Sequence, residues 1–479
     1  MTAPTYRTLD GDQATLPAEA VDDFAARLRG HLILPTDADY APLRRVWNGM
    51  VDRQPALIAG CQGNQDIVQA IDFARSRRMC LSVRGGGHHI AGNAIAEGGL
   101  VIDLSAMRSV HVDPRQAAAR VAPGALLGDV DAETQAFGLA TPLGINSTTG
   151  VAGLTLGGGF GWLTRKFGMT ADNLLSADVI TADGQRHRVS AEQEPELFWA
   201  LRGGGGNFGV VTSFEFRLHP VGPEIHAGLV VYPFEQARQV LQAWRDFTRQ
   251  APEELSVWAI LRDAPPLPFL PEAVHGQRVV VFALLHCGDP ASAERDVAPV
   301  LAFGDPVGQM LGTQPYAGFQ AAFDPLLAPG ARNYWKSHDF ADLADEALEQ
   351  AITAAEALPG PECEIFLAQL GGAMSRVEPT ATAYAGRDAY YVMNVHARWQ
   401  EPAEDDRCRD WARDVFHALA PFATGGGYVN FLTEDEGDRV ASAYGVNYER
   451  LQAVKRRHDP DNLFRVNLNI PPAAAEDAA

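Results

Sequence analysis

The sequence predicts an α+β protein of two domains, and three observations support this class. The chain has 479 residues, more than one hydrophobic core usually serves. Two prolines and a glycine within residues 220–223 interrupt regular structure. Before this point helix and strand patterns alternate, and after it the patterns indicate a sheet covered by helices. We therefore place a domain boundary at residues 220–223.

The first half of the chain reads as one mixed α/β unit that ends near His219. Ile67, Ile71 and Ala74 recur with helical spacing after Asn64, a residue type that caps helices. From Val210 to Leu218, apolar and polar residues alternate, as a strand with one buried face requires. In chain order we expect a helix from residue 64, strands over 80–83 and 100–104, a hairpin around 182–184, and a strand over 210–218.

The second half contains longer apolar runs that predict a sheet with helices on it. Proline is frequent over residues 265–271, which indicates a surface loop. We expect strands over 229–232, 255–261, 279–285, 364–370 and 389–399, with helices over 234–250 and 291–301.

Composition excludes several classes of protein. Hydrophobic residues make up 46% and charged residues 21% of the chain, and no run of eighteen or so apolar residues predicts a membrane span. Residues 1–10 lack the pattern of a secretory signal, so we expect a cytoplasmic protein without a membrane partner. The net charge of −21 repels polyanions, so we expect no nucleic-acid partner. The five scattered cysteines favour neither a disulfide framework nor a thiolate zinc site.

The most informative segment is the glycine cluster of residues 84–93, which reads Arg-Gly-Gly-Gly-His-His-Ile-Ala-Gly-Asn. Consecutive glycines let backbone amides turn inward and form an anion-binding concavity. A glycine turn with two surface histidines is one alternative. A metal site is another, but adjacent histidines on an extended segment point to opposite faces, so we expect no metal. The functional interpretation is a phosphate-binding loop whose histidine lies beside a cofactor ring.

A second glycine cluster follows over residues 150–161, where six of twelve residues are glycine. Backbone amides that precede a helix near Trp162 suit a pyrophosphate. These glycines could instead serve only the tight packing of a strand on a helix.

The end of the chain offers a third candidate. Residues 448–472 read as a helix end, a turn and an extended tail. Asn467 and Asn469 alternate along this tail and could present their amides from one face.

Together these segments resemble the berberine bridge enzyme-like family, within the flavin-binding superfamily of p-cresol methylhydroxylase and vanillyl-alcohol oxidase. The resemblance covers nearly the whole chain. The segments that carry it are residues 84–92, 150–161, 202–211, 428–431 and 459–472.

The resemblance implies the domain organisation. A PCMH-type FAD-binding domain of two α/β subdomains spans residues 1–221, with its core over 51–221. A substrate domain with an antiparallel sheet covered by helices spans 222–429, and residues 430–479 return to complete the FAD-binding domain. The active site then lies between the domains, a common location for pockets.

The resemblance also implies the cofactor, FAD, and its attachment. His88 matches the histidine that bonds covalently to the 8α-methyl group of the flavin. Members with two links have a cysteine at the position of Asn146, so we expect a single link. Thr149 stands where an apolar residue controls oxygen access, and Leu154 where many relatives have histidine. The other expected FAD-binding residues are Arg84, Gly85, Gly86, Gly87, His89, Gly92, Asn93, Gly150, Gly153, Gly157, Gly158, Gly159, Phe160, Gly161, Gly209, Val211, Asn467 and Asn469.

The expected chemistry is hydride transfer to the flavin, assisted by a base. We assign catalytic roles to Tyr428, Asn430 and Glu364, with His396 and Lys336 as further candidates for the base. Tyr428 and Asn430 are two residues apart, so in a strand they share one face. The family often has a tyrosine at the position of Phe431, and phenylalanine cannot act as a base.

These features predict an FAD-dependent oxidase. Its substrate is expected to be a small alcohol, carbohydrate, phenol or cyclic amine, with dioxygen as the second partner and hydrogen peroxide as a product. An FAD-dependent dehydrogenase with another electron acceptor is the alternative, and a non-catalytic flavin-binding protein is a third hypothesis. The sequence assigns neither the substrate nor the oligomeric state.

Overall fold

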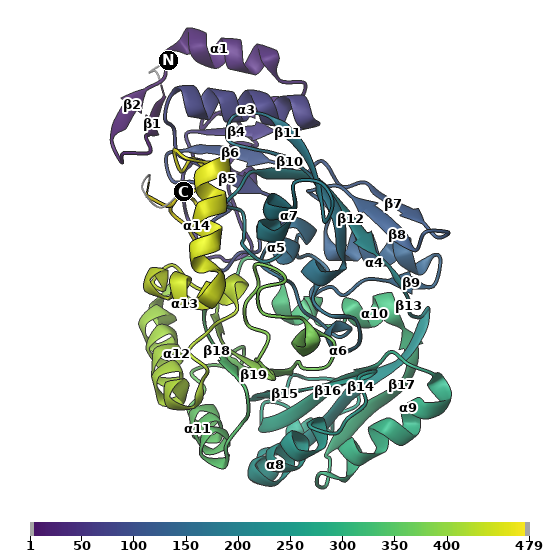
Figure 1. Cartoon of the computed structure of the whole chain (residues 1–479). Coiled ribbons are helices and arrows are strands. Elements are labelled where there is room, and N and C mark those ends of the chain that lie inside the picture. Colours follow the sequence, from purple (N-terminus) through teal and green to yellow (C-terminus); the bar gives the residue numbers. More distant parts are fainter. Residues whose placement is uncertain (1–3, 475–479) are drawn as a thin grey trace.

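The chain folds around three main sheets, with the cavity described below between them (Figure 1). The computed structural model describes residues 4–474; the ends of the expected FAD-binding domain, 1–3 and 475–479, lie outside the described residues. The predicted fold class is confirmed, since helices and strands are mixed before residue 220 and an antiparallel sheet follows it.

The parallel sheet is built from the N-terminal part of the chain. Its order is β3 (His31–Ile33), β4 (Leu57–Gly60), β6 (Leu100–Asp103) and β5 (Leu81–Arg84), with β3 antiparallel to β4. Helix α3 (Asn64–Ser76) buries Ile67, Ile71 and Ala74 and contacts β6 and α1 (Ala18–Arg27). Because β5 ends at Arg84, the first glycine cluster begins at the end of a buried strand.

The middle sheet is antiparallel. Its order is β11 (Arg186–Ser190), β10 (Leu174–Ile180), β12 (Val210–Arg217), β8 (Ala118–Val121) and β7 (Val110–Asp113). Strand β12 confirms the alternation seen in the sequence, since Phe214 and Phe216 are fully buried. The helices in this part of the chain are α4 (Leu127–Gln135), α5 (Val151–Leu156), α6 (Thr164–Phe167) and α7 (Pro195–Leu201).

The large sheet is antiparallel, and its strands all lie within residues 222–429, the segment proposed as the substrate domain. Its order is β17 (Gly308–Pro315), β14 (Glu224–Pro233), β16 (Arg278–His286), β15 (Leu255–Asp263), β19 (Glu364–Gln369), β20 (Tyr391–Trp399) and β18 (Arg332–Phe340). Helices α8 (Ala237–Thr248), α11 (Asp345–Glu356) and α12 (Asp405–Leu419) pack together along it (Figure 1). The other face contributes to the cavity.

Smaller elements complete the fold. Strands β1 (Thr5–Arg7) and β2 (Gln13–Thr15) pair near the N-terminus, and β9 (Leu139–Ala140) pairs with β13 (His219–Pro220). The remaining helices are α2 (Tyr40–Leu43), α9 (Pro290–Val297), α10 (Tyr316–Gln320), α13 (Val440–Tyr444) and α14 (Tyr448–His458). Helix α14 contacts α7, so the end of the chain returns to the first half (Figure 1).

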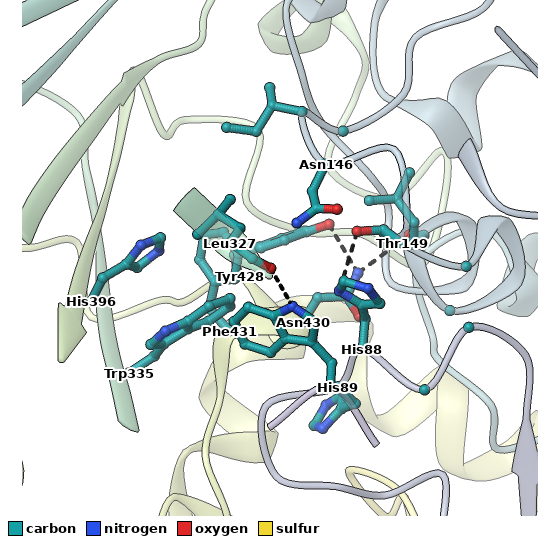
Figure 2. Close-up of a pocket in the computed structure, with 18 of the residues that line it drawn as sticks. His88, His89, Asn146, Thr149, Leu327, Trp335, His396, Tyr428, Asn430 and Phe431 are labelled. Atoms are coloured by element: carbon teal, nitrogen blue, oxygen red, sulfur yellow. Dashed lines mark hydrogen bonds between the residues drawn. The ribbon is translucent and has the colours of Figure 1, made fainter. Parts of the chain in front are cut away.

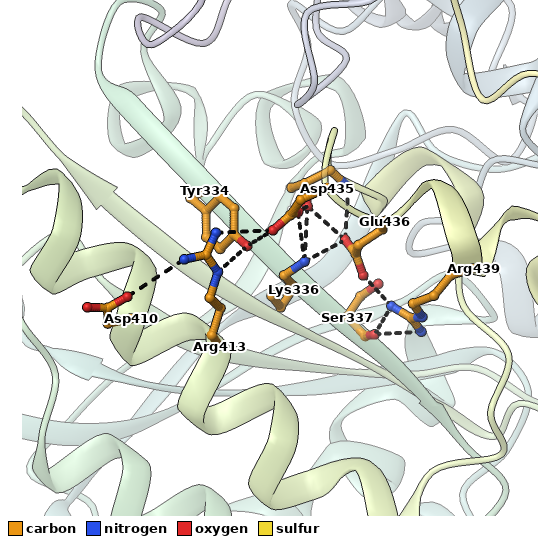
Figure 3. Close-up of polar contacts among 9 residues, drawn as sticks. Tyr334, Lys336, Ser337, Asp410, Arg413, Asp435, Glu436 and Arg439 are labelled. Atoms are coloured by element: carbon orange, nitrogen blue, oxygen red, sulfur yellow. Dashed lines mark hydrogen bonds and ion pairs between the residues drawn. The ribbon is translucent and has the colours of Figure 1, made fainter.

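A buried ion network joins this returning segment to β18, an edge strand of the large sheet (Figure 3). Lys336 Nζ lies 2.9 Å from Asp435 Oδ1 and 3.3 Å from Glu436 Oε2, and its side chain is 6% exposed. Burial alone raises the pKa of Asp435, but hydrogen bonds from Tyr334, Thr433 and Lys336 outweigh it and hold this pKa well below its ordinary value. The network fixes residues 433–436 on the edge of the large sheet.

Removing the ammonium group of Lys336 is expected to destabilise the fold, because the buried Glu436 and the partly exposed Asp435 lose a cation they share. We expect Lys336→Met to lower the free energy of unfolding by about 3 kcal/mol, measured by urea denaturation. The matched control is Lys166→Met, because Lys166 forms only a partly exposed pair with Glu254 at 3.5 Å. Equal losses in the two variants would contradict this account.

Candidate active site

A cavity of about 710 Å³ lies between the glycine clusters and the large sheet (Figure 2). Its lining combines three parts of the chain: glycine-rich loops of the first half, strand faces of the large sheet, and the segment 428–431 with the tail near residue 467. The predicted site residues found in the lining are Gly85, Gly86, Gly87, His88, His89, Asn93, Asn146, Thr149, Gly150, Gly153, Phe160, Gly209, Val211, Glu364, Tyr428, Asn430 and Asn467.

The two glycine clusters touch each other at Gly86 and Gly150. A Cβ atom added at Gly86 would lie 2.4 Å from the backbone nitrogen of Gly150, and one added at Gly150 would lie 2.4 Å from that of Gly86. By contrast, a Cβ atom at Gly153 or Gly206 would have no protein atom within 4 Å, although both residues line the cavity. Gly86 and Gly150 therefore must be glycine to allow their close contact. Gly153 and Gly206 instead leave open space beside the backbone.

His88 follows directly after the first cluster and faces the second one (Figure 2). Its Nε2 lies 2.9 Å from Thr148 Oγ1, and its Nδ1 lies 3.5 Å from Thr149 Oγ1. Burial lowers the pKa of His88 to about 4, so its imidazole is neutral at physiological pH. His89 lies on the other side of the segment, where its Nδ1 accepts a hydrogen bond from the Ala91 amide at 3.2 Å.

Trp47 is a site residue that the sequence analysis missed. Its ring stacks against His88 with centroids 5.4 Å apart, and its backbone amide donates to Gly87 O at 3.0 Å. Its indole Nε1 donates to Leu327 O at 2.7 Å, which connects the histidine loop to the opposite wall. An isolated tryptophan carries no motif, so only these tertiary contacts reveal it.

The large sheet contributes a charged cluster to the opposite wall. Glu364 on β19 accepts a hydrogen bond from Arg262 at 2.7 Å and contacts His396 Nδ1 at 3.1 Å. Burial raises the pKa of Glu364, but Arg262 and His396 outweigh burial and lower it to about 2, so the carboxylate stays ionised. The ring of His396 stacks on Trp335 with centroids 4.5 Å apart. Both oxygens of Glu364 are engaged, which leaves His396 as the more available proton acceptor.

The segment of Tyr428 and Asn430 differs from its expected structure. Residues 429–431 form one 3-10 turn instead of a strand, because the Phe431 amide bonds back to Tyr428 O at 2.9 Å. The two side chains still meet, since the side-chain amide of Asn430 donates to the Tyr428 hydroxyl at 2.9 Å. The Gly159 amide also donates to this hydroxyl, at 3.1 Å. Burial raises the pKa of Tyr428 to about 12, so the phenol keeps its proton at neutral pH.

Several predicted cofactor residues lie outside the cavity lining. These are Arg84, Gly92, Gly157, Gly158, Gly159, Gly161 and Asn469. A Cβ atom at Gly161 would lie 1.7 Å from Leu143 O, and one at Gly157 would lie 2.2 Å from Asn430 Oδ1. This part of the second cluster therefore serves close packing, as the alternative interpretation expects, and the pyrophosphate loop stays a prediction for Gly150 and Gly153, which line the cavity. The helix expected to start near Trp162 begins at Thr164 and is one turn long.

Lys336 also lies outside the cavity lining, because its ammonium group is held by Asp435 and Glu436. Among the described residues, 4–474, no three His, Cys, Asp or Glu side chains gather in a way that could hold a metal ion. No helix within this described part is long and apolar enough to cross a membrane.

Comparison with known proteins assigns the family. The model of the FAD binding domain matches residues 55–190, and the model described as berberine and berberine like matches residues 427–471. The chain is 31% identical over 462 residues to (R)-6-hydroxynicotine oxidase of Paenarthrobacter nicotinovorans, which covers 93% of this chain and 97% of the relative. The chain belongs to the berberine bridge enzyme-like family. It is thus an FAD-linked oxidoreductase.

Other similar proteins agree with this assignment. The chain is 31% identical over 453 residues to the FAD-linked oxidoreductase YgaK of Bacillus subtilis (strain 168), covering 93% of this chain and 98% of the relative. The crystal structure of 6-hydroxy-D-nicotine oxidase from Arthrobacter nicotinovorans superposes with a TM-score of 0.84 at 30% identity, covering 93% and 98% of the two chains. The structure of Physcomitrella patens BBE-like 1, at 22% identity and a TM-score of 0.85, shares the fold over 94% of this chain and 99% of its own.

The residues present fit the FAD of this family. Gly153 and Gly206 leave open space along the wall where a dinucleotide would need close backbone approach. In the described tail, the buried Oδ1 atom of Asn467 has no hydrogen-bond partner although the residue lines the cavity. An unpaired buried acceptor is costly unless a ligand satisfies it. The glycine loops, His88 and Asn467 would therefore hold the cofactor.

Filling the open space beside Gly153 is expected to weaken FAD binding without unfolding the protein. A valine at this position meets no protein atom at Cβ but projects into the cavity. We expect Gly153→Val to raise the dissociation constant of FAD at least about tenfold, a loss of ~1.4 kcal/mol, measured by flavin titration of the apoprotein. Gly360→Val is the control, because its Cβ also has no neighbour within 4 Å and Gly360 lies outside the cavity. An unchanged FAD affinity in Gly153→Val would show that this wall does not face the cofactor.

Proposed function

We propose that the protein is an oxidase. It removes a hydride from a small alcohol, carbohydrate, phenol or cyclic amine, and dioxygen is then reduced to hydrogen peroxide. The observation that carries this proposal is the shared cavity, in which the glycine loops with His88 face the cluster of Glu364, His396 and Trp335 on the large sheet. The name of the relative (R)-6-hydroxynicotine oxidase supports an oxidase.

In this proposal His88 forms one covalent bond to FAD. The imidazole is neutral and faces the cavity, as a nucleophile for bond formation must be. Asn146, at the position where two-link members have cysteine, lacks a thiol, so a second bond is absent. The domains proposed for this arrangement are 1–221 and 430–479 for FAD and 222–429 for the substrate.

FAD supplies the hydride acceptor when it is bound. The chain's own residues orient the substrate and take its proton. Trp335 and Phe431, with ring centroids 5.5 Å apart, form an aromatic wall beside the cavity. Glu364 holds Nδ1 of His396, so that Nε2 accepts a proton from a substrate hydroxyl or amine. Tyr428 keeps its own proton and, with Asn430, positions the reacting group through hydrogen bonds.

A dehydrogenase that passes electrons to another acceptor is the second candidate. The observation that favours it is Thr149, whose hydroxyl lines the cavity 3.5 Å from His88 Nδ1, at the position that controls oxygen access in relatives. The hydroxyl makes this position polar, whereas the residue that controls oxygen access in relatives is apolar.

The holoenzyme is expected to bleach under anaerobic conditions with at least one of four probes. These are benzyl alcohol, cellobiose, 4-ethylphenol and 6-hydroxynicotine, which represent the four proposed substrate classes. Admission of air is then expected to restore the flavin absorbance and form one hydrogen peroxide per flavin reduced. Reoxidation by a quinone dye but not by air would favour the dehydrogenase. No bleaching by any probe would contradict this set of substrate classes.

Loss of the His396 imidazole is expected to slow flavin reduction by whichever of the four probes bleaches the holoenzyme. General-base catalysis contributes about 10²–10⁴-fold, so we expect His396→Gln to lower the rate of reduction by a factor in this range. Rapid-mixing absorbance under anaerobic conditions measures it, and His111→Gln, at an exposed position of β7, is the control. A rate within threefold of the unchanged protein would exclude His396 as the base.

A further inference from the structure

A chain of hydrogen bonds leads from Asn146 through Thr148 to His88. Asn146 Oδ1 lies 2.6 Å from Thr148 Oγ1, and Thr148 Oγ1 lies 2.9 Å from His88 Nε2. All three residues lie where the two glycine clusters meet, and Asn146 is buried. The direction of each bond follows from the chemistry of the groups.

The backbone amide of Thr148 fixes the orientation of Asn146. This amide can only donate, and it lies 3.0 Å from the Asn146 side-chain atom assigned as Oδ1. The atom at this position must therefore be the oxygen, since an NH₂ group there would face another donor. Because Oδ1 carries no hydrogen, the Thr148 hydroxyl donates its only proton to it.

The Thr148 oxygen then has only lone pairs to offer to His88. A hydrogen bond between Thr148 Oγ1 and His88 Nε2 requires the proton to sit on Nε2. The imidazole is neutral, so it carries a single proton and its Nδ1 keeps a lone pair. Thr149 Oγ1 lies 3.5 Å from Nδ1 in a long hydrogen bond, in which the Thr149 hydroxyl donates to this lone pair. Among residues 4–474, no charged side chain hydrogen-bonds to this ring.

We propose that Asn146 and Thr148 are positioning residues that hold His88 in the Nε2–H tautomer, so that Nδ1 is the atom that bonds to the 8α-methyl carbon of FAD. This inference rests on the covalent attachment proposed above. The new bond replaces one C–H bond of the methyl group and the N–H bond of the imidazole. The two hydrogens, with two electrons, reduce dioxygen to hydrogen peroxide, so atoms and electrons balance.

The same two residues assist bond formation electrostatically. Positive charge develops on the imidazole as the Nδ1 lone pair is shared, and the Nε2–H bond to Thr148 strengthens with this charge. Asn146 supports this hydrogen bond, because it accepts the Thr148 proton and so leaves the lone pairs of the Thr148 oxygen directed toward His88. Trp47 stacks on the ring and limits its rotation. Members with two flavin links use the position of Asn146 for the second link. In this chain the same position thus assists the first link, through Thr148 and His88.

The test measures covalent attachment and requires no substrate. Flavin-free protein is mixed with FAD in air, and flavin that stays with the denatured polypeptide is followed over time by in-gel fluorescence. We expect Thr148→Val to slow attachment about 10–100-fold, the effect of one lost hydrogen bond to a charged group, while Thr148→Ser restores it. Asn146→Leu is expected to slow attachment, and Asn146→Asp, which keeps an acceptor for the Thr148 hydroxyl, is expected to preserve it.

A separate measurement shows that the variants still fold and bind. In Thr148→Val the dissociation constant of FAD before attachment, from fluorescence titration, is expected to change less than about threefold, because Thr148 lies outside the cavity lining and contacts His88. Thr155→Val is the matched control, since its buried hydroxyl donates to Val151 O at 2.7 Å and does not contact His88. Equal attachment rates in Thr148→Val, Asn146→Leu and the control would overturn the proposal.

The site of attachment tests the tautomer in the unchanged protein, even if a variant fails to fold. Nuclear magnetic resonance of the purified flavin peptide distinguishes the two imidazole isomers. A bond at Nδ1 of His88 supports the proposed role of Asn146 and Thr148. A bond at Nε2 overturns this role but leaves the proposed covalent attachment of FAD intact. An unchanged protein that releases all its flavin on denaturation would overturn both.

Discussion

The contact between Gly86 and Gly150 is the constraint on which the site depends. A Cβ atom on either residue would lie 2.4 Å from the backbone nitrogen of the other, so the two loops approach to a distance that only glycine permits. This approach places His88, two residues after Gly86, against Thr148, two residues before Gly150. The same contact leaves Gly153 facing open space. One backbone contact therefore shapes both the surroundings of His88 and the open wall of the cavity at Gly153.

The opposite wall is held in register by contacts along β18, the edge strand of the large sheet. Asn48 pairs with Asn333 through hydrogen bonds of 2.9 and 3.0 Å, and the Gly49 amide donates to Ala331 O at 2.8 Å. The Lys336 network fixes the returning segment on the same strand. An edge strand has backbone groups that no neighbouring strand pairs. Here the segment at Asn48 and Gly49 and the returning segment both contact this edge strand. The large sheet is thereby positioned against the glycine loops, and Trp335 faces the cavity.

Strong local patterns predicted their elements, and weak ones did not. The helix from Asn64 and the strand from Val210 formed as expected, because their apolar periodicity matches one buried face. The edge strands β17 and β18 were missed: β17 is largely exposed, and β18 carries charged and polar residues that find partners only in the folded protein. The segment after Tyr428 forms a single turn and no strand, because the Phe431 amide bonds back to Tyr428 O.

The sequence by itself determined the flavin-binding family, because the family depends on short motifs whose backbone chemistry is local. It also named the first glycine loop and His88 as candidate site residues, and both line the cavity. Tertiary structure alone decided which glycines face the cavity and which pack against backbone, as at Gly161. It also brought Trp47 to Leu327, 280 residues away in the chain. The direction of the hydrogen bonds around His88 is likewise decided by folding. Such contacts join distant segments, and their geometry exists only when the whole chain packs.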